Sequence, residues 1–313
     1  QATFNIDGFS EQYYGKVYFS DTTQTASAGW VEVYDRATKK KLIHVDADEL
    51  SFDLYDNPQK AYITKIPYEE QSAILYKDFN FDGVKDFAII DGFRNWTLGH
   101  SFKIFLASSK RFVFSDSFTE LTQDNQGMFT VNAINKTIST KSKIGDTWYQ
   151  YSDYIVENNK PKLIRRHTDD YEHAPFYRET IEELKGNKMV KTTRSSLALE
   201  RYHIEECFKF HVDKVNKDII LCNFYDDRLY YVILDAKQNV EFYYPFEELR
   251  QTSDFIFYRK NGKLTFKNKD ASYTIYDKSG KIGVDITYKG KIHQWKGNTK
   301  SRRGSIGKLL KGS

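Results

Sequence analysis

Five residues between positions 78 and 86 have the types and spacing of a calcium loop. They are Asp78, Asn80, Asp82, Val84 and Asp86. Oxygen donors at alternating positions converge on one point when a chain winds tightly, and Ca²⁺ takes oxygen ligands. Gly83 permits the sharp turn, and Val84 offers its main-chain carbonyl. We therefore predict an EF-hand-like calcium loop with these five ligands.

The flanks of this loop indicate strands rather than the helix pair of a true EF-hand. Short apolar runs lie at 73–76 and 87–90, and Ile89 stands where a helix-flanked loop would place a bidentate Glu. Asp86 must therefore complete the shell. A polar hairpin turn with coincidental acids is the alternative, but five matched positions disfavour it. Because neighbouring carboxylates repel each other, the ion is expected to hold the loop together.

The composition is that of an aromatic-rich β protein. The chain has 313 residues, of which 40% are hydrophobic, with 23 Tyr and 23 Phe. This length suffices for a large core in one or two domains. No apolar run approaches the roughly 18 residues that a membrane span needs. Residue 1 is Gln, which favours a removed signal peptide or a truncation and an extracytoplasmic location.

The net charge of +4 is concentrated at the carboxyl end. Residues 296–313 contain six basic residues and no acid, so the remainder is slightly acidic. This distribution does not indicate a nucleic-acid groove in the body of the protein. We expect residues 296–313 to form a basic tail that packs loosely or is disordered.

Alternating strands dominate the rest of the sequence. Short runs of apolar and polar residues end at Asp, Asn, Thr or Gly, and more than twenty strands can be assigned with turn signals between them. This pattern favours an all-β, propeller-like assembly of about five or six antiparallel blades, with a pair of sandwiches as the alternative. The predicted domain covers residues 1–295.

The only two cysteines, Cys207 and Cys222, flank a predicted hairpin. A disulfide between them would close a loop and stabilise the fold by roughly 3 kcal/mol. Two buried free thiols are equally compatible with the sequence. No Cys/His cluster predicts zinc.

Three runs resemble one bacterial family. They are DFNFDGVKDFAIIDG, FKIFLASSKRFVFSDSFTEL and the segment through TWYQYSDYIVENNKPKLIRR, which contains the turn NNKPKL. They are similar to secreted or periplasmic lysozyme-inhibitor and immunity proteins with a propeller-like fold and one EF-hand-like calcium loop. The resemblance covers about residues 25–195, whereas 196–295 diverge. The calcium motif is shared by many propellers, so the two later runs are the more specific.

The resemblance implies a protective, non-enzymatic function. Such proteins lie outside the cytoplasm, in the periplasm or secreted, and the sequence leaves open whether a lipid anchored this chain before processing. They plug the cleft of a peptidoglycan hydrolase delivered by a rival or sibling cell. The calcium ligands carry over to Asp78, Asn80, Asp82 and Asp86. Some relatives have a cysteine pair before the tryptophan, where this chain has Asp146 and Thr147 before Trp148.

Two loops could reach into such a cleft. A muramidase cleft is long and acidic, so an aromatic side chain next to a cation suits it. Residues 91–100 are too polar for a strand, and we predict partner contacts there, although Trp96 could instead fold back onto a sheet. The second loop, at 167–177, is more simply a solvated connection than a metal site. The predicted contacts are Arg94, Asn95, Trp96, His100, Tyr171 and His173.

Two other functions fit the sequence less well. A calcium-stabilised module that binds carbohydrate or a surface would also use abundant aromatic residues. An enzyme is disfavoured, because the chain has no GxSxG, HExxH or glycine-rich phosphate loop.

Overall fold

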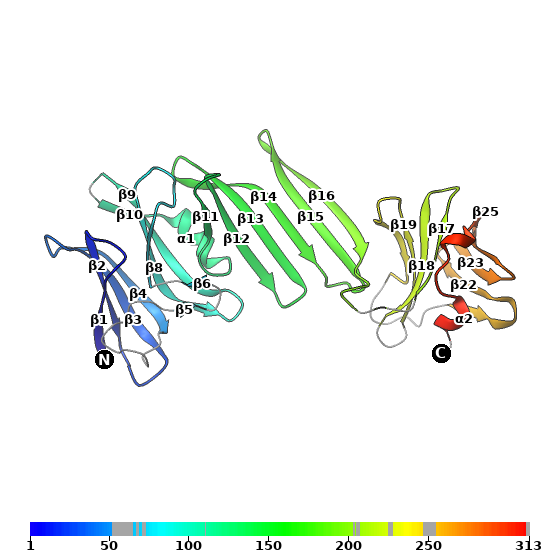
Figure 1. Cartoon of the computed structure of the whole chain (residues 1–313), viewed down its shortest axis with the longest axis horizontal. Coiled ribbons are helices and arrows are strands. Elements are labelled where there is room, and N and C mark those ends of the chain that lie inside the picture. The colour runs from blue at the N-terminus through cyan, green and yellow to red at the C-terminus, as the bar shows by residue number, and fades with distance from the viewer. Residues whose placement is uncertain are drawn as a thin grey trace. The chain divides into compact units, whose positions relative to one another are not determined.

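A computed structural model shows that the chain is all-β. It describes residues 1–51, 65–66, 69–70, 73–109, 111–202, 204, 207–224, 228–246 and 255–310. Within these ranges the chain forms 25 β-strands and only two short α-helices (Figure 1). The prediction of more than twenty strands and almost no helix is confirmed.

The chain divides into two compact units. The first comprises residues 1–169 and 180–192, and the second comprises 170–179 and 193–313. The sequence predicted one domain over 1–295 with a separate tail, so the structure differs from that division. The physical reason is that the buried residues form separate cores, one in the first unit and two in the second.

The first unit contains two four-stranded antiparallel sheets in which consecutive strands are neighbours. One sheet comprises β1 (Ala2–Ile6), β2 (Tyr13–Phe19), β3 (Ala26–Asp35) and β4 (Lys41–Ser51). The other comprises β7 (Ile74–Lys77), β8 (Asp86–Asn95), β9 (Gly99–Ser108) and β10 (Arg111–Phe114). A two-stranded ribbon, β5 (Lys65–Ile66) and β6 (Glu69–Glu70), is also present.

The helix α1 (Asp116–Gln123) completes the hydrogen bonds of β9 beyond the end of β10. Thr122 Oγ1 accepts from the Phe102 N–H at 2.9 Å, and Thr119 Oγ1 accepts from the Ile104 N–H at 3.0 Å. Buried backbone N–H groups need such partners. The hydroxyls of Thr119 and Thr122 therefore hold β9 in place.

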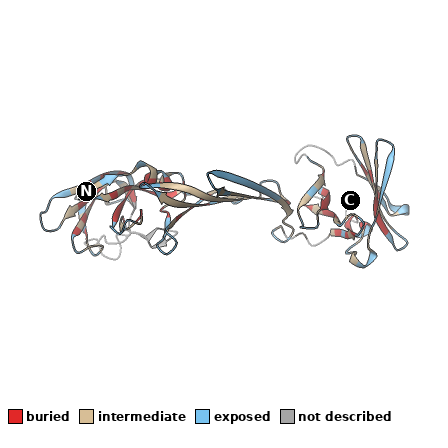
Figure 2. Cartoon of the chain, turned by 90° about the horizontal axis from the view of Figure 1, so that it is seen from above, coloured by how far each residue is buried: buried red, intermediate tan, exposed pale blue. Residues whose placement is uncertain are grey.

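A six-stranded meander follows, with β11 (Thr130–Asn132), β12 (Thr137–Ile144), β13 (Trp148–Glu157), β14 (Lys160–Asp170), β15 (Phe176–Lys185) and β16 (Lys188–Leu197). Strands β15 and β16 change unit along their length. They are mostly exposed or half-buried (Figure 2), in contrast to the largely buried strands β8, β9, β18 and β19.

The core of the first unit is rich in aromatic rings that meet edge to face. Tyr13 contacts Phe87 and Phe112 at ring-centroid distances of 5.4 and 5.6 Å, and Tyr76 stacks on Phe87 at 4.6 Å. Such pairs stabilise a core by about 0.5–1.5 kcal/mol each beyond their burial. The high Tyr and Phe content is used here for packing.

The second unit has two meander sheets. The first comprises β17 (Cys207–Val212), β18 (Lys217–Phe224), β19 (Arg228–Leu234) and β20 (Val240–Tyr244). The second comprises β21 (Ile256–Tyr258), β22 (Lys263–Asn268), β23 (Ala271–Lys278), β24 (Lys281–Tyr288) and β25 (Lys291–Lys296). The strands β18 and β19 are buried on both faces, which explains their continuous apolar runs.

The expectation of a loose tail at 296–313 is wrong for its described part. After the 3-10 turns η1 (Arg259–Asn261) and η2 (Thr299–Ser301), the helix α2 (Ile306–Leu309) packs against β17 and β18. Ile306, Leu309 and Leu310 are buried in the core of the second unit. Their i, i+3, i+4 spacing gives this basic segment one apolar face.

Five of the sheets contain four or more antiparallel strands. The all-β, multi-sheet part of the fold prediction is therefore confirmed. The described residues show no closed ring of blades, so the propeller itself is not established.

Candidate calcium loop and partner-binding surfaces

The predicted calcium loop is the connection between β7 and β8. Phe81 and Gly83 both lie in the left-handed region, with φ of 63° and 86°. Glycine adopts this conformation without the steric cost that a side chain brings. The two left-handed residues wind the chain tightly, as the sequence predicted from Gly83.

Side-chain carboxylates hold this winding by accepting backbone hydrogen bonds. Asp78 Oδ2 accepts from the Gly83 N–H at 2.9 Å, and Asp78 Oδ1 accepts from the Asp82 N–H at 3.2 Å. Asp82 Oδ1 accepts from the Val84 N–H at 2.8 Å. The loop is thus folded around its own acids, and the Val84 side chain points outward with 53% exposure.

Asn80 joins the loop to a distant turn. Its Nδ2 donates to Asp82 Oδ2 at 3.0 Å and to Asn159 Oδ1 at 3.1 Å. Asn159 follows Asn158 in the β13–β14 turn, and both residues have positive φ. The turn NNKPKL therefore lies against the predicted calcium loop, which the sequence did not reveal.

Asp86 is the buried member of the set. It is 0% exposed and accepts from the Phe79 N–H at 2.7 Å and the Ala107 N–H at 2.8 Å. Burial, with a smaller contribution from the negative charges of Asp82 and Asp78, raises the pKa of this carboxyl to about 6. Two backbone donors oppose the shift without cancelling it. A cation near Asp86 would relieve this unfavourable buried charge.

The residues fit a calcium ion by donor chemistry. Three carboxylates, one amide and one carbonyl form an all-oxygen set, which is the preference of hard cations. Among the described residues, however, Asp78, Asp82 and Asp86 do not bring one oxygen each within 4.8 Å of the others. The loop would have to draw its carboxylates inward when an ion binds.

Trp96 lies on the turn between β8 and β9, at the opposite end of β8 from Asp86. Its side chain is 86% exposed, and its ring meets Phe93 edge to face at 5.4 Å. Asn95 Oδ1 accepts from the N–H groups of Thr97 and Leu98, both at 2.8 Å. Asn95 therefore shapes the turn, and of the two orientations considered for Trp96 the outward one is correct.

The structure places Arg94 at the surface and His100 in the interior. Arg94 is exposed beside Asp91, with Nη2 and Oδ2 3.9 Å apart. His100 is only 4% exposed and packs against Phe93, so its prediction as a surface contact is wrong. Residues 99–108 form a strand, which carries His100 into the interior, and burial lowers the pKa of its imidazole.

The second predicted contact set belongs to the other unit. Tyr171 is half-buried, stacked on Tyr177 at 4.7 Å, with the guanidinium carbon of Arg201 3.9 Å from its ring centroid. His173 is exposed. Because Trp96 is in the first unit, the two sets do not form one site within a unit.

A pocket in the second unit was not predicted. It has a volume of about 450 Å³ on the face of β23–β25. Its lining includes Asn268, Asp270, Tyr273, Tyr288, His293 and Trp295. The pairing of Tyr273 with Ile286, and of Ile286 with His293, places these residues on one face. The sequence signal that could have indicated it is the set of Tyr273, Tyr288, His293 and Trp295, which occur on successive strands.

No protein-family profile matches this chain, and no curated protein matches it. Among solved structures it is similar to a Xanthomonas type IV secretion system related protein, with 20% identity over 60% of this chain and 92% of that chain and a TM-score of 0.46. It is also similar to TolB from Acinetobacter baumannii, with 9% identity over 94% and 65% of the two chains and a TM-score of 0.22.

The WD40 domain of Toxoplasma gondii coronin is a further similar structure, with 8% identity over 91% and 68% of the two chains and a TM-score of 0.21. All three scores lie below 0.5, so these likenesses carry no functional conclusion for this chain. None of the described helices is long and apolar enough to cross a bilayer.

Proposed function

We propose that the chain is an immunity protein that binds and inhibits a peptidoglycan-degrading, lysozyme-like hydrolase in the periplasm or outside the cell. It acts as a binding protein and not as an enzyme. The observation that carries this proposal is the Trp96 side chain, which is 86% exposed on a turn fixed by hydrogen bonds. Large exposed aromatic residues are enriched among the anchors of protein interfaces.

The turn is held in place by a second connection. The Gly127 N–H donates to the Leu98 carbonyl at 2.7 Å, and Gln126 Nε2 donates to the Thr97 carbonyl at 2.7 Å. A partner that binds Trp96 therefore does not have to order a mobile loop, which lowers the entropic cost of association.

The segment that holds this turn is itself tied to a neighbouring strand. The Gln126 N–H donates to the Lys141 carbonyl at 2.7 Å, which joins the segment to β12. We call Arg94 and Trp96 the Trp96 surface.

The charge of the Trp96 surface suits an acidic partner. Arg94 contributes a guanidinium that is 42% exposed and only loosely paired with Asp91. The cleft of a glycoside hydrolase contains two carboxylates and space for sugar rings. An aromatic ring flanked by a cation could occupy that space and pair with one carboxylate.

Calcium, in this proposal, stabilises the protein and does not touch the partner at Trp96. The strand β8 runs from Asp86 to Asn95, and at about 3.3 Å per residue it separates the loop from Trp96 by about 30 Å. Asp78, Asn80, Asp82, Asp86 and the Val84 carbonyl would hold the ion. It would neutralise the buried Asp86 and fix the contact from Asn80 to Asn159.

We extend the proposal to the architecture. Three of the sheets are four-stranded meanders, which is the shape of propeller blades, and closure into a propeller-like assembly is part of this hypothesis. A structure that fixes the two units relative to each other would test it.

The function can be tested by affinity capture from a peptidoglycan-hydrolase-containing secretome in calcium buffer. The captured fraction is then separated on a gel that contains peptidoglycan. A lytic band retained by the wild-type chain and lost with Trp96→Ala is the expected result. Captured proteins without lytic activity, or a lytic band retained equally by both chains, would contradict the proposed mode of inhibition.

A carbohydrate-binding module is the second candidate, and the pocket on β23–β25 favours it. Tyr288 and Trp295 offer ring faces, and Asn268, Asp270 and His293 offer polar groups for hydroxyls. Its volume of about 450 Å³ is within the range of small-ligand sites. Binding of purified glycan without any protein partner, abolished by Trp295→Ala, would select this function.

A further inference from the structure

Cys207 and Cys222 face each other on adjacent strands. In the antiparallel pairing of β17 with β18, these two residues are direct partners. They are also the only cysteines of the chain. Both thiols are free in this structure. Directly opposite residues have Cβ atoms on the same face of a sheet, about 4.5–5.5 Å apart.

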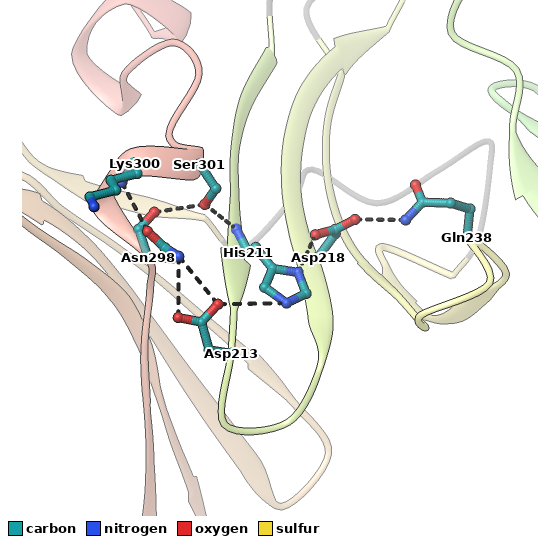
Figure 3. Close-up of polar contacts among 7 residues, drawn as sticks. All are labelled: His211, Asp213, Asp218, Gln238, Asn298, Lys300 and Ser301. Atoms are coloured by element: carbon teal, nitrogen blue, oxygen red, sulfur yellow. Dashed lines mark hydrogen bonds and ion pairs between the residues drawn. The ribbon is translucent and has the colours of Figure 1, made fainter.

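The hydrogen bonds of β17 reveal the type of this pair. The Lys209 N–H and carbonyl both bond to Arg303, on the side away from β18, at 2.9 Å each. His211 likewise directs its N–H to Ser301 Oγ and its carbonyl to the Asn298 N–H, and Figure 3 shows the contact with Ser301. Backbone groups alternate along a strand, so Cys207 also directs its N–H and carbonyl away from β18.

The position of Gly304 agrees with this assignment. A Cβ atom on Gly304 would lie 2.2 Å from the Cys207 carbonyl oxygen, so that oxygen faces the C-terminal segment. Cys207 and Cys222 are therefore a non-hydrogen-bonded pair, for which the Cα atoms lie about 4.5 Å apart. Disulfides span Cα distances of about 4.4–6.8 Å. The backbone can accept the bond without rearrangement.

The two thiols differ in environment. Cys222 is fully buried among the residues of the smaller core, whereas Cys207 is half-buried. A hydrogen bond from the Cys222 thiol lowers the pKa of Cys207, and the charge of Lys209 lowers it further. The same hydrogen bond, together with burial, raises the pKa of Cys222. Cys207 is therefore the more accessible and the more acidic thiol.

We propose that Cys207 and Cys222 form a cross-strand disulfide when the protein meets a low-molecular-weight disulfide or a thiol–disulfide oxidoreductase. The Cys207 thiolate attacks the external disulfide, which forms a mixed disulfide and releases one thiol. The Cys222 thiol then attacks the Cys207 sulfur and releases the second external thiol. Two protein thiols are oxidised, and one external disulfide is reduced to two thiols.

The bond would lock the hairpin on which the C-terminal segment docks. That segment contacts β17 through Arg303 and through Asn298 and Ser301, whose network with His211, Asp213 and Asp218 is drawn in Figure 3. Closing the segment 208–221 lowers the entropy of the unfolded chain. The second unit would then become more stable in an oxidising compartment.

The full chain should be equilibrated with excess oxidised glutathione, or with dithiothreitol, and its thiols counted in denaturant. Peptide mapping should link Cys207 to Cys222, and the oxidised protein should melt on the order of 10 °C above the reduced one. Cys207→Ser should show no redox-dependent shift and no covalent dimer, because Cys222 is buried.

Two results would overturn the proposal. One is folded wild-type protein, verified by circular dichroism, in which both thiols remain reactive after oxidation. The other is a disulfide that joins two molecules instead of the two strands.

Discussion

Substitution of Asp86 by Asn tests its role as a calcium ligand separately from its effect on the stability of the calcium-free fold. The Asp86 carboxylate is fully buried and accepts two backbone N–H groups. In the calcium-free protein its pKa is raised from 3.8 to about 6. At pH 7 this shift lowers the free energy of unfolding by about 3 kcal/mol, because the folded protein must keep the buried Asp86 carboxylate ionised.

The Asp86→Asn substitution removes that cost but introduces another. The side-chain amide of the variant can accept from only one of the two N–H groups, and an unpaired buried donor costs about 1–3 kcal/mol. The calcium-free variant at pH 7 should therefore be between equal to the wild type and about 2 kcal/mol more stable. With free calcium at about 100 times its dissociation constant, the wild type should gain about 2.7 kcal/mol and the variant almost none.

The pH dependence has a defined sign. The folded chain holds the Asp86 proton more tightly than the unfolded chain, because the folded pKa is the higher of the two. Its contribution to the free energy of unfolding is therefore complete below pH 4 and lost as the pH rises through about 6. Asp86→Asn should remove this slope. Calcium should also bind less well below pH 6, where the proton competes.

Urea unfolding at several pH values, in chelator and in calcium, measures each of these quantities. Asp146→Asn is the matched control, because Asp146 is 93% exposed in the same unit. Equal calcium stabilisation of Asp86→Asn and the wild type, or none in the wild type, would refute the assignment of Asp86 as a ligand.

Three further changes test other parts of the molecule. Trp96→Ala should weaken inhibition by at least about 2 kcal/mol, or about 30-fold, without changing stability. The control Ile134→Ala, at a residue that is 94% exposed, should change neither inhibition nor stability, as measured by inhibition assays and urea unfolding. Ile306→Ala should destabilise the second unit by about 2–5 kcal/mol in urea unfolding, and Lys308→Ala should not; equal effects would contradict the docking of α2. Tyr171→Ala should lose about 1 kcal/mol of stability through its stacking on Tyr177 and the cation of Arg201, and calcium titration should be unaffected.

The strands and turns could be predicted because their signals are local. In β2 buried and half-buried residues alternate, as the alternating sequence pattern predicted. The positive φ of Asn158 and Asn159 matches the expected turn. The tight winding of the predicted calcium loop was indicated by Gly83 and the flanking acids, whereas the positive φ of Phe81 was not predicted.

What could not be predicted depends on contacts between elements. The buried position of His100 follows from the pairing of Phe93 with His100 across β8 and β9, and it was missed because residues 91–100 were interpreted as too polar for a strand. The helix α1 forms where its Thr hydroxyls accept hydrogen bonds from β9. The C-terminal residues Ile306, Leu309 and Leu310 are held in place by a core that other strands form. The contact from Asn80 to Asn159 joins residues that are 79 positions apart.

Inhibition of peptidoglycan hydrolysis is the most direct measurement. The captured hydrolase should be titrated with the calcium-loaded chain, and the clearing of purified sacculi followed. Complete inhibition near one equivalent, lost with Trp96→Ala and retained with Ile134→Ala, is the predicted result. Unchanged hydrolysis at a large excess of folded, calcium-loaded chain would contradict the proposed function.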